Sequence, residues 1–417
     1  MAVVKVFSKM GPGLLFAGAA IGVSHIVQST RAGAVYGLWM IPVVILVLCL
    51  KYPAFAFGPQ YAQATGKSLL HGYQERSRWH LALFILAMIL PFFIVVASVT
   101  LVTAGLAGAA FGLEFPVLWI AIAVLFASIL LLQTGGYRLM DRMMKWVVAF
   151  ITLSTFVATF VALHNLELSG LTWSSTEFLQ VQTLFFVVAL LGFMPAPVDL
   201  SVMHSLWTVE KQKHTTISGT DAWWDFNVGY LGCGLLALCF ILLGASLMYP
   251  SGVRFENSAV GFAQQVIQMY SQSLGPYMGF LVGISAFLIL FSTTLTVLDG
   301  FSRVVAESAA LLSVRFTTIS LHGWNYSRAL WAFGIGAITI LAVFQVSIKG
   351  LVDFATSVTF VLSPFVAYLN HDVMFSGALD PVHVPSRGMK LLSLLGTIVL
   401  GAVVVVFFWV KWFYVSG

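Results

Sequence analysis

The sequence predicts an all-α integral membrane protein, on the evidence of its composition, its long apolar runs and the placement of its charges. Of its 417 residues, 60% are hydrophobic and 8% are charged, whereas soluble domains carry about 25% charged residues. So few charges cannot cover a water-exposed surface, so most of the surface must face lipid. The three cysteines lie in apolar runs without the spacing of a metal site, and we interpret them as buried hydrophobic residues.

Apolar stretches of about 20 residues are long enough to cross the hydrocarbon core as helices. Eleven occur, and the loops between them are short, so we expect one transmembrane domain over residues 1–417. A short amphipathic helix is also expected within Arg254–Leu274. The predicted spans are, in order, Gly13–Gly37, Leu38–Gln60, Trp79–Phe111, Pro116–Gln133, Met143–Leu163, Leu179–Trp207, Val228–Tyr249, Tyr277–Gly300, Ala329–Gln345, Leu351–Tyr368 and Leu391–Phe413.

The basic residues predict the orientation, because cytoplasmic loops carry an excess of Lys and Arg. With the N-terminus inside, inner segments hold 15 of the 20 basic residues and Lys51 lies within a span. One missed span would invert every later loop, so the uneven split supports eleven spans. The uneven distribution of basic residues predicts a cytoplasmic N-terminus and an outer C-terminus. We expect the protein in a bacterial inner (cell) membrane. The same distribution also explains the net charge of +5 without a nucleic-acid partner. The outer segments hold the other four, Arg31, Arg254, Lys349 and Lys411.

Two spans are expected to be broken near the middle of the membrane. In the first, an apolar half ends at Gly22 and the polar stretch Ser24–Arg31 follows. In the sixth, Pro195 and Pro197 each remove a helix hydrogen bond. Unwound backbone at this depth survives only where protein or a water-filled cavity satisfies it. The alternative is a pair of kinked helices in another kind of bundle.

Broken helices at positions one and six are typical of transporters built from an inverted repeat. We therefore predict a five-plus-five repeat, with residues 13–163 as the first half and residues 179–368 as the second. The span at residues 391–413 would be an additional helix.

Several motifs resemble the Nramp family of divalent-metal transporters, and through it the wider LeuT-like group. RAGAVYG at Arg31–Gly37 resembles the family's run after its DPGN motif, and ATGKSLLHGYQER at Ala64–Arg76 resembles its VTG-x-x-L stretch. In span six, FMPAPVDLSVMHSLW resembles the MPHN-x-x-x-HS segment, and VLSPFVAY in span ten resembles the LS-x-x-LPF run. The resemblance implies a carrier of divalent metal ions that works by alternating access, with proton coupling left open.

The motif residues themselves depart from the family pattern. Where the family has Asp-Pro-Gly-Asn, this sequence reads Gly22-Val23-Ser24-His25, so the metal-binding carboxylate is absent. In span six, if Pro195 is the motif proline, Met194 takes the place of the family's Met ligand. If Pro197 is the motif proline, Ala196 replaces the Met and Asp199 falls at the Asn position.

Asp199 and His25 are the tentative metal ligands. A carboxylate near the bilayer centre costs roughly 3 kcal/mol, so Asp199 needs water, a cation or a basic partner. It suits Mg²⁺, Mn²⁺ or a proton, although it could instead cap the second half-helix. His25 could ligate a metal or bond free carbonyls of the break. Ser24 and carbonyls near Gly22 and Met194 would supply neutral oxygens.

Other polar residues are candidates for gating or a proton path. Arg31 faces the outer vestibule or snorkels to the membrane edge, with Asp353 as a conceivable partner. His204 belongs to a proton path or is simply packed, and Lys51 is deep enough to suggest a role. A helical stripe that could pair in series as an intracellular latch consists of Asp299, Arg303 and Glu307.

We do not expect an enzyme, because the sequence has neither a nucleophile elbow nor a phosphate loop nor a zinc motif. No cofactor is predicted. The expected partners are the lipid bilayer and either a divalent metal ion or a small solute. The leading hypothesis is a divalent-cation transporter of the Mg²⁺ or Mn²⁺ class, and the alternative is an ion-coupled carrier of a small organic solute such as an amino acid.

Overall fold

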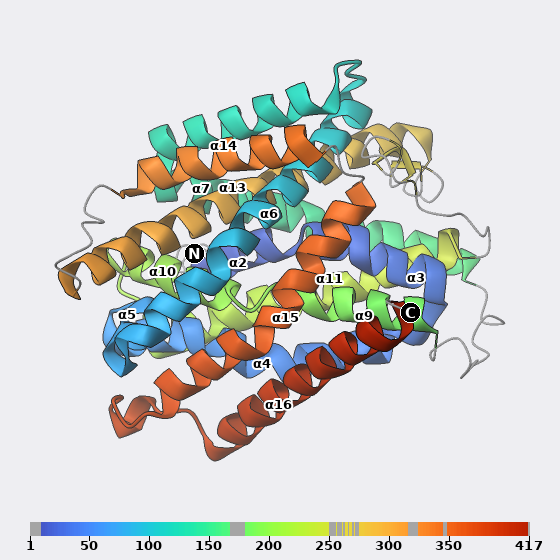
Figure 1. Cartoon of the computed structure of the whole chain (residues 1–417). Helices are drawn as coiled ribbons and strands as arrows, with labels where there is room; N and C mark the ends of the chain where they lie inside the picture. The colour runs from blue at the N-terminus through green and yellow to red at the C-terminus, as the bar shows by residue number, and fades with distance from the viewer. Residues whose placement is uncertain are drawn as a thin grey trace.

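The computed structural model describes residues 10–166, 180–249, 275–315, 324–344 and 348–415, with single positions between 256 and 271. Every regular element in these ranges is a helix, and the long helices lie side by side along a roughly common direction (Figure 1). This confirms the all-α class. The amphipathic helix predicted within Arg254–Leu274 lies largely outside the described residues.

The first half of the chain is built around one broken span and three long helical segments. Its helices are α2 (Pro12–Ala20), the π-helix η1 (Val23–Ser29), α3 (Thr30–Tyr36), η2 (Gly37–Trp39), α4 (Met40–Thr65), α5 (Leu69–Arg76), α6 (Arg78–Phe111), α7 (Val117–Ala162) and η3 (Leu163–Asn165).

The second half begins with another broken span and ends in a long C-terminal helix. Its helices are α9 (Val181–Phe193), α10 (Leu200–Gln212), α11 (Gly219–Leu247), α13 (Pro276–Arg315), α14 (Tyr326–Phe344), α15 (Ile348–Phe375), η5 (Pro381–His383), α16 (Arg387–Val410) and η6 (Lys411–Val415).

Both predicted interruptions are present. In span six, α9 ends at Phe193 and α10 begins at Leu200, so residues 194–199 are not helical. In span one, α2 ends at Ala20 and the irregular stretch is only Ile21 and Gly22, because the chain continues as the π-helix η1. His25 therefore lies in a wide helical turn rather than in unwound backbone.

The helices long enough to cross a membrane can be compared with the eleven predicted spans. The described residues contain eight helical runs long and apolar enough to span a membrane. Two of these runs, Pro12–Thr65 and Val117–Ala162, contain a break, and α9 is too short to be counted. The backbone of Gly136 is non-helical, with φ 53° and ψ −158°, and divides α7 into two helices. The count of eleven spans therefore stays a prediction, as does the internal repeat.

Several spans are longer than predicted at their polar ends, and the largest differences are in α11 and α13. The helix α11 begins nine residues before the predicted Val228, because Ser218 and Asp221 form a capping box at its start. The helix α13 continues past Gly300 to Arg315, so Asp299 and Arg303 lie within one continuous helix.

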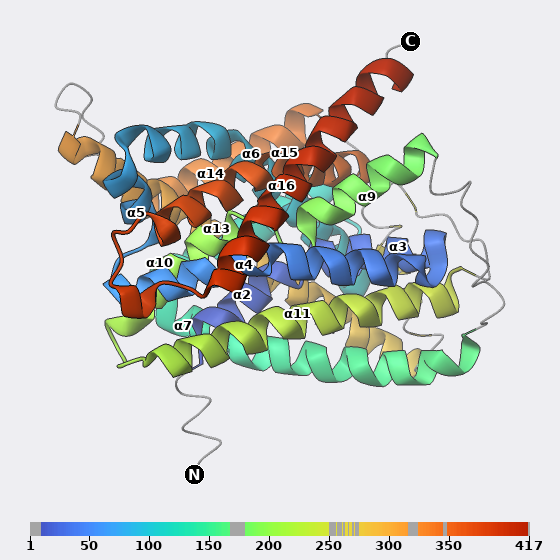
Figure 2. The same ribbon diagram turned by 90° about the horizontal axis from the view of Figure 1, so that it is seen from below.

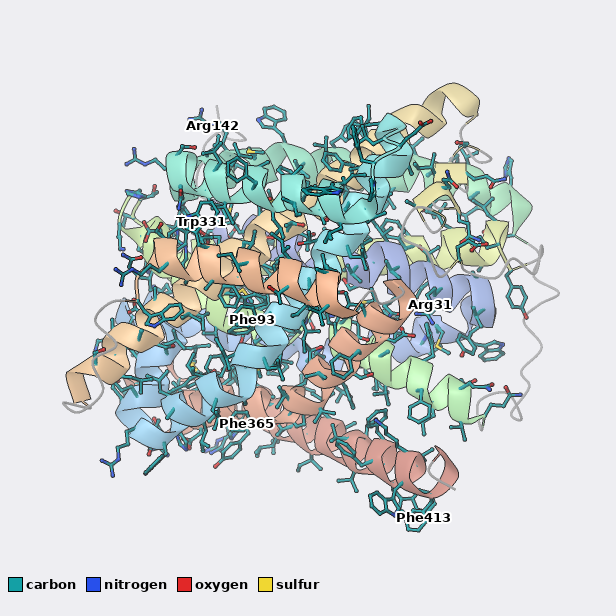
Figure 3. The ribbon with its side chains drawn as sticks, turned by 45° about the horizontal axis from the view of Figure 1, so that its top comes forward. Arg31, Phe93, Arg142, Trp331, Phe365 and Phe413 are labelled. Atoms are coloured by element: carbon teal, nitrogen blue, oxygen red, sulfur yellow. The ribbon has the colours of Figure 1, made fainter. Side chains whose placement is uncertain are left out.

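The arrangement of helices places the broken spans in the interior. The helix α2 packs against α7, α10, α11 and α13, while α16 packs outside α15 and α4 and crosses them obliquely (Figure 2). Large apolar side chains on the outer helices are exposed, among them Trp146 at 76% and Ile398 at 67%. Such a surface suits contact with lipid. Arg142 and Arg31 lie toward opposite ends of the bundle, with Phe413 at the Arg31 end (Figure 3).

Candidate ion-binding site between the two broken spans

The break in span one is held against α13 by a hydroxyl. The Oγ1 of Thr293 donates to the carbonyl of Gly18 at 2.9 Å and also lies 3.4 Å from that of Ile21. A Cβ on Gly22 would lie 2.6 Å from this Oγ1 atom, so only glycine allows the close approach. Thr293 thus occupies backbone oxygens that the end of α2 leaves free.

The break in span six is filled by the side chain of Lys51 from α4. Its Nζ lies within hydrogen-bond distance of four carbonyl oxygens of α9 and the unwound segment, at 2.8–3.2 Å. The side chain is completely buried. The unwound backbone is therefore satisfied by protein, as its depth in the membrane requires.

Asp199 lies directly before α10 and faces a small cavity between the two breaks. It occupies the N-cap position of α10 but makes no side-chain capping bond. The cavity has a volume of about 30 Å³ and is lined by Ser24, Ala196, Asp199 and Thr293, among mostly apolar neighbours. Such a volume admits about two water molecules. Within the described part of the chain, Asp199 has no salt-bridge partner, although its charge interacts with that of Lys51.

Met194 and Ala196 point to different environments. Ala196 lines the cavity, whereas Met194 is fully buried in an apolar cluster with Met40, Ile241 and Phe360. The geometry therefore favours the motif register in which Pro197 is the motif proline and Asp199 takes the Asn position.

His25 is fully buried and does not line this cavity. Its Nε2 lies 2.8 Å from the carbonyl oxygen of Cys233 on α11. Its Nδ1 lies 2.6 Å from the hydroxyl of Ser24 and 2.9 Å from the carbonyl of Ala20. These contacts agree with the alternative that His25 bonds backbone carbonyls. Both ring nitrogens are occupied in this way, so neither is free to bind a metal. Its assignment as a ligand remains a prediction.

The oxygen donors around the cavity suit a hard cation. They comprise one carboxylate and two hydroxyl groups, and the described residues contain no cluster of three His, Cys, Asp or Glu side chains. Hydroxyl and carboxylate oxygens are the ligands of Mg²⁺ and Mn²⁺, and soft ions prefer sulfur.

The C-terminal half of α13 carries a buried ionic network. Asp299 is fully buried and accepts from Arg303 Nε at 2.8 Å, from Trp207 Nε1 at 2.8 Å and from Tyr326 hydroxyl at 2.6 Å. Arg303 also pairs with Glu210 on α10 at 3.4 Å. The network joins α10, α13 and α14 as the predicted latch would.

The predicted pairing in series stops at Arg303. Glu307 instead lies 3.4 Å from His71 on α5. The difference arises because α10 and α5 each bring a partner to the same face of α13. Two separate contacts therefore replace the single stripe.

His204, on α10, is packed between the aromatic rings of two other helices. Its ring stacks on Phe16, with centroids 5.5 Å apart, and lies 5.8 Å from the ring of Phe226. Neither ring nitrogen has a hydrogen-bond partner among the described residues. These contacts agree with the alternative that His204 is simply packed. Its place in a proton path remains a prediction.

Arg31 lines a larger cavity, of about 570 Å³, between α3, α9, α15 and α16. Its guanidinium pairs with Asp353 at 2.8 Å, the partner anticipated from the sequence, and bonds Gln28 at 3.3 Å. The pairing cancels most of the charge that would repel a cation.

Two residues of the central region were missed by sequence reasoning. Thr293 belongs to a run of hydroxyl residues, Ser292–Thr294, inside the apolar span eight, which could have marked it. Asp225 on α11 is buried and accepts from the backbone N–H of Gly11 at 3.0 Å and of Gly13 at 2.7 Å. It caps α2 from another helix, and it lay outside the predicted span.

The fold and the two interrupted spans define a LeuT-like membrane transporter. The family model described as "Natural resistance-associated macrophage protein-like" matches residues 13–410. The chain belongs to this family, Nramp, as the motif resemblance indicated. A relative, the uncharacterized protein PM0681 of Pasteurella multocida (strain Pm70), is 32% identical over 404 residues, covering 96% of this chain and 92% of the relative.

Solved structures of similar fold include transporters of different substrates. A manganese transporter of Eremococcus coleocola, in complex with an aromatic bis-isothiourea compound, has a TM-score of 0.65 at 14% identity, covering 96% of this chain and 86% of that one. MhsT in complex with L-phenylalanine has the same TM-score and identity, with coverage of 95% and 97%. At this identity the likeness shows the fold alone.

Proposed function

We propose that this chain is a secondary active transporter that carries a divalent metal cation of the Mg²⁺ or Mn²⁺ class by alternating access. The observation that carries the proposal is the position of Asp199. This buried carboxylate has no salt-bridge partner among the described residues and lines a small cavity between the two broken spans, together with the hydroxyls of Ser24 and Thr293. A carboxylate at this depth is costly unless a cation or water compensates it.

Selectivity for hard ions follows from the register of span six. Ala196, rather than a thioether, faces the cavity, and the Met194 side chain packs in an apolar cluster. A site of carboxylate and hydroxyl oxygens discriminates by charge and size and binds soft Cd²⁺ weakly. Membership of the Nramp family and the fold shared with a manganese transporter support a metal substrate.

The two ends of the bundle supply candidate gates. The inner end is closed by the Asp299–Arg303–Glu210 network, and Arg31 pairs with Asp353 toward the other end. Alternating access would open these ends in turn around the central site. The protein would lie in the bacterial inner membrane with its N-terminus in the cytoplasm. Coupling of transport to protons is tested by varying the pH gradient in the assay.

Uptake into proteoliposomes tests the proposal. The assay compares Mg²⁺, Mn²⁺, Fe²⁺, Zn²⁺ and L-phenylalanine, with and without a pH gradient. We expect uptake of Mg²⁺ or Mn²⁺, and we expect Asp199→Asn to remove most of it because the amide keeps the shape and loses the charge.

The matched control is Asp380→Asn, which changes an exposed carboxylate that caps η5. It should transport like the wild type. Uptake of phenylalanine without any divalent ion would refute the metal assignment in favour of an organic substrate.

A further inference from the structure

The buried ammonium of Lys51 sits in a cage made of backbone oxygens. The four carbonyls belong to Leu191, Gly192, Met194 and Ala196, at 3.0, 3.2, 3.0 and 2.8 Å from Nζ. The first two lie in the last turn of α9, where carbonyl oxygens lack helical partners and the helix dipole is negative. The other two lie in the unwound segment that follows.

The number and arrangement of these oxygens are those of an ion site. An ammonium group has three N–H donors, so four acceptors within hydrogen-bond distance cannot each receive a separate linear bond. What they share is attraction to one positive charge at their centre. Rings of backbone carbonyls around one point are how proteins bind Na⁺ and K⁺ in place of the hydration shell.

The side chain of Lys51 is held in place by aromatic packing. The side chain enters from α4, and its Nζ lies 5.7 Å from the centroid of the Phe55 ring one turn further along. Phe55 in turn contacts the rings of Phe16 and Tyr230. The residue is 0% exposed, so its ammonium group is shielded from bulk solvent.

We propose that the Lys51 ammonium is a tethered monovalent cation, which fills a carbonyl cage at the break of span six that would otherwise bind Na⁺ or K⁺. The chain thus supplies from its own sequence the charge that holds the unwound segment together. The cage adjoins the cavity that Asp199 lines, since Ala196 belongs to both, but Lys51 itself does not line that cavity. The inference therefore holds whatever solute is transported.

Thermal unfolding of the purified full chain tests the inference. Midpoints are compared in NaCl, KCl, methylammonium chloride and choline chloride at equal ionic strength. The wild type should unfold at the same temperature in all four, because its cage is already full. Lys51→Ala should unfold several degrees lower in choline, and Na⁺, K⁺ or methylammonium should restore part of the loss.

The control is Lys67→Ala, which removes an exposed lysine paired with Glu75 and should show no dependence on the cation. Specific stabilisation of the wild type by Na⁺ or K⁺ would overturn the inference. An unfolding midpoint of Lys51→Ala that is the same with all the cations would also overturn it.

If Lys51→Ala does not fold, Lys51→Gln replaces it, because its amide donates to carbonyls without a charge. The inference predicts that Lys51→Gln unfolds below the wild type. Equal unfolding midpoints for Lys51→Gln and the wild type would show that hydrogen bonding alone suffices and would refute the role of the charge.

Discussion

Removing the carboxylate of Asp299 should loosen the packing of α10, α13 and α14 by a measurable amount. Asp299→Ala deletes the acceptor for Arg303, Trp207 and Tyr326, which come from α13, α10 and α14. It also leaves Arg303, whose side chain is 19% exposed, without its shortest ion pair. Breaking a buried pair in this way costs about 4 kcal/mol.

The expected temperature shift follows from the size of the chain. An unfolding entropy of about 2.1 cal/mol/K per residue gives roughly 0.9 kcal/mol/K for 417 residues. A loss of about 4 kcal/mol then lowers the unfolding midpoint by about 4 °C. The assay is thermal unfolding in detergent, followed by intrinsic tryptophan fluorescence.

The matched control lies on the same face of the same helix. Glu307→Ala removes a carboxylate that is 37% exposed and pairs with a partly exposed His71. Such pairs contribute little, so a shift below about 1 °C is expected. Equal shifts for the two variants would refute the view that the Asp299 network, rather than any carboxylate on α13, holds α10, α13 and α14 together.

Two further substitutions test the support of span one. Gly22→Ala should abolish transport, because its Cβ would lie 2.6 Å from Thr293 Oγ1. The control Gly232→Ala, whose Cβ would have nothing within 4 Å, should transport normally. An active Gly22→Ala would show that the close approach is dispensable. Asp225→Asn should speed hydrogen exchange of the amides at residues 11–16, because its two carboxylate oxygens serve Gly11 and Gly13 separately and the amide has only one acceptor oxygen. Unchanged exchange there would contradict the capping role.

The fold class and both interruptions could be predicted because their causes are local. Apolar length marks a span, and Pro195 and Pro197 remove helix hydrogen bonds wherever they stand. The helix ends were harder to place. The start of α11 depends on a capping box with few apolar residues, and α13 runs beyond the apolar stretch because α10 and α5 cover its polar end.

The candidate site was only partly predictable, since it depends on contacts across the fold. Asp199 follows from its depth and its place after the prolines. The direction in which His25 points depends on a carbonyl 208 residues away, at Cys233, and no sequence pattern encodes that contact. The same holds for Lys51, whose carbonyl partners lie at least 140 residues further along the chain.

The most direct test of the central claim is calorimetry with purified wild type and Asp199→Asn. The account predicts that Mg²⁺ or Mn²⁺ binds the wild type, that Cd²⁺ binds poorly and that Asp199→Asn loses the binding. Met194→Ala should bind as the wild type does, because this side chain does not line the cavity. Tight binding of Cd²⁺ that Met194→Ala abolishes, or divalent-ion binding that survives in Asp199→Asn, would contradict it.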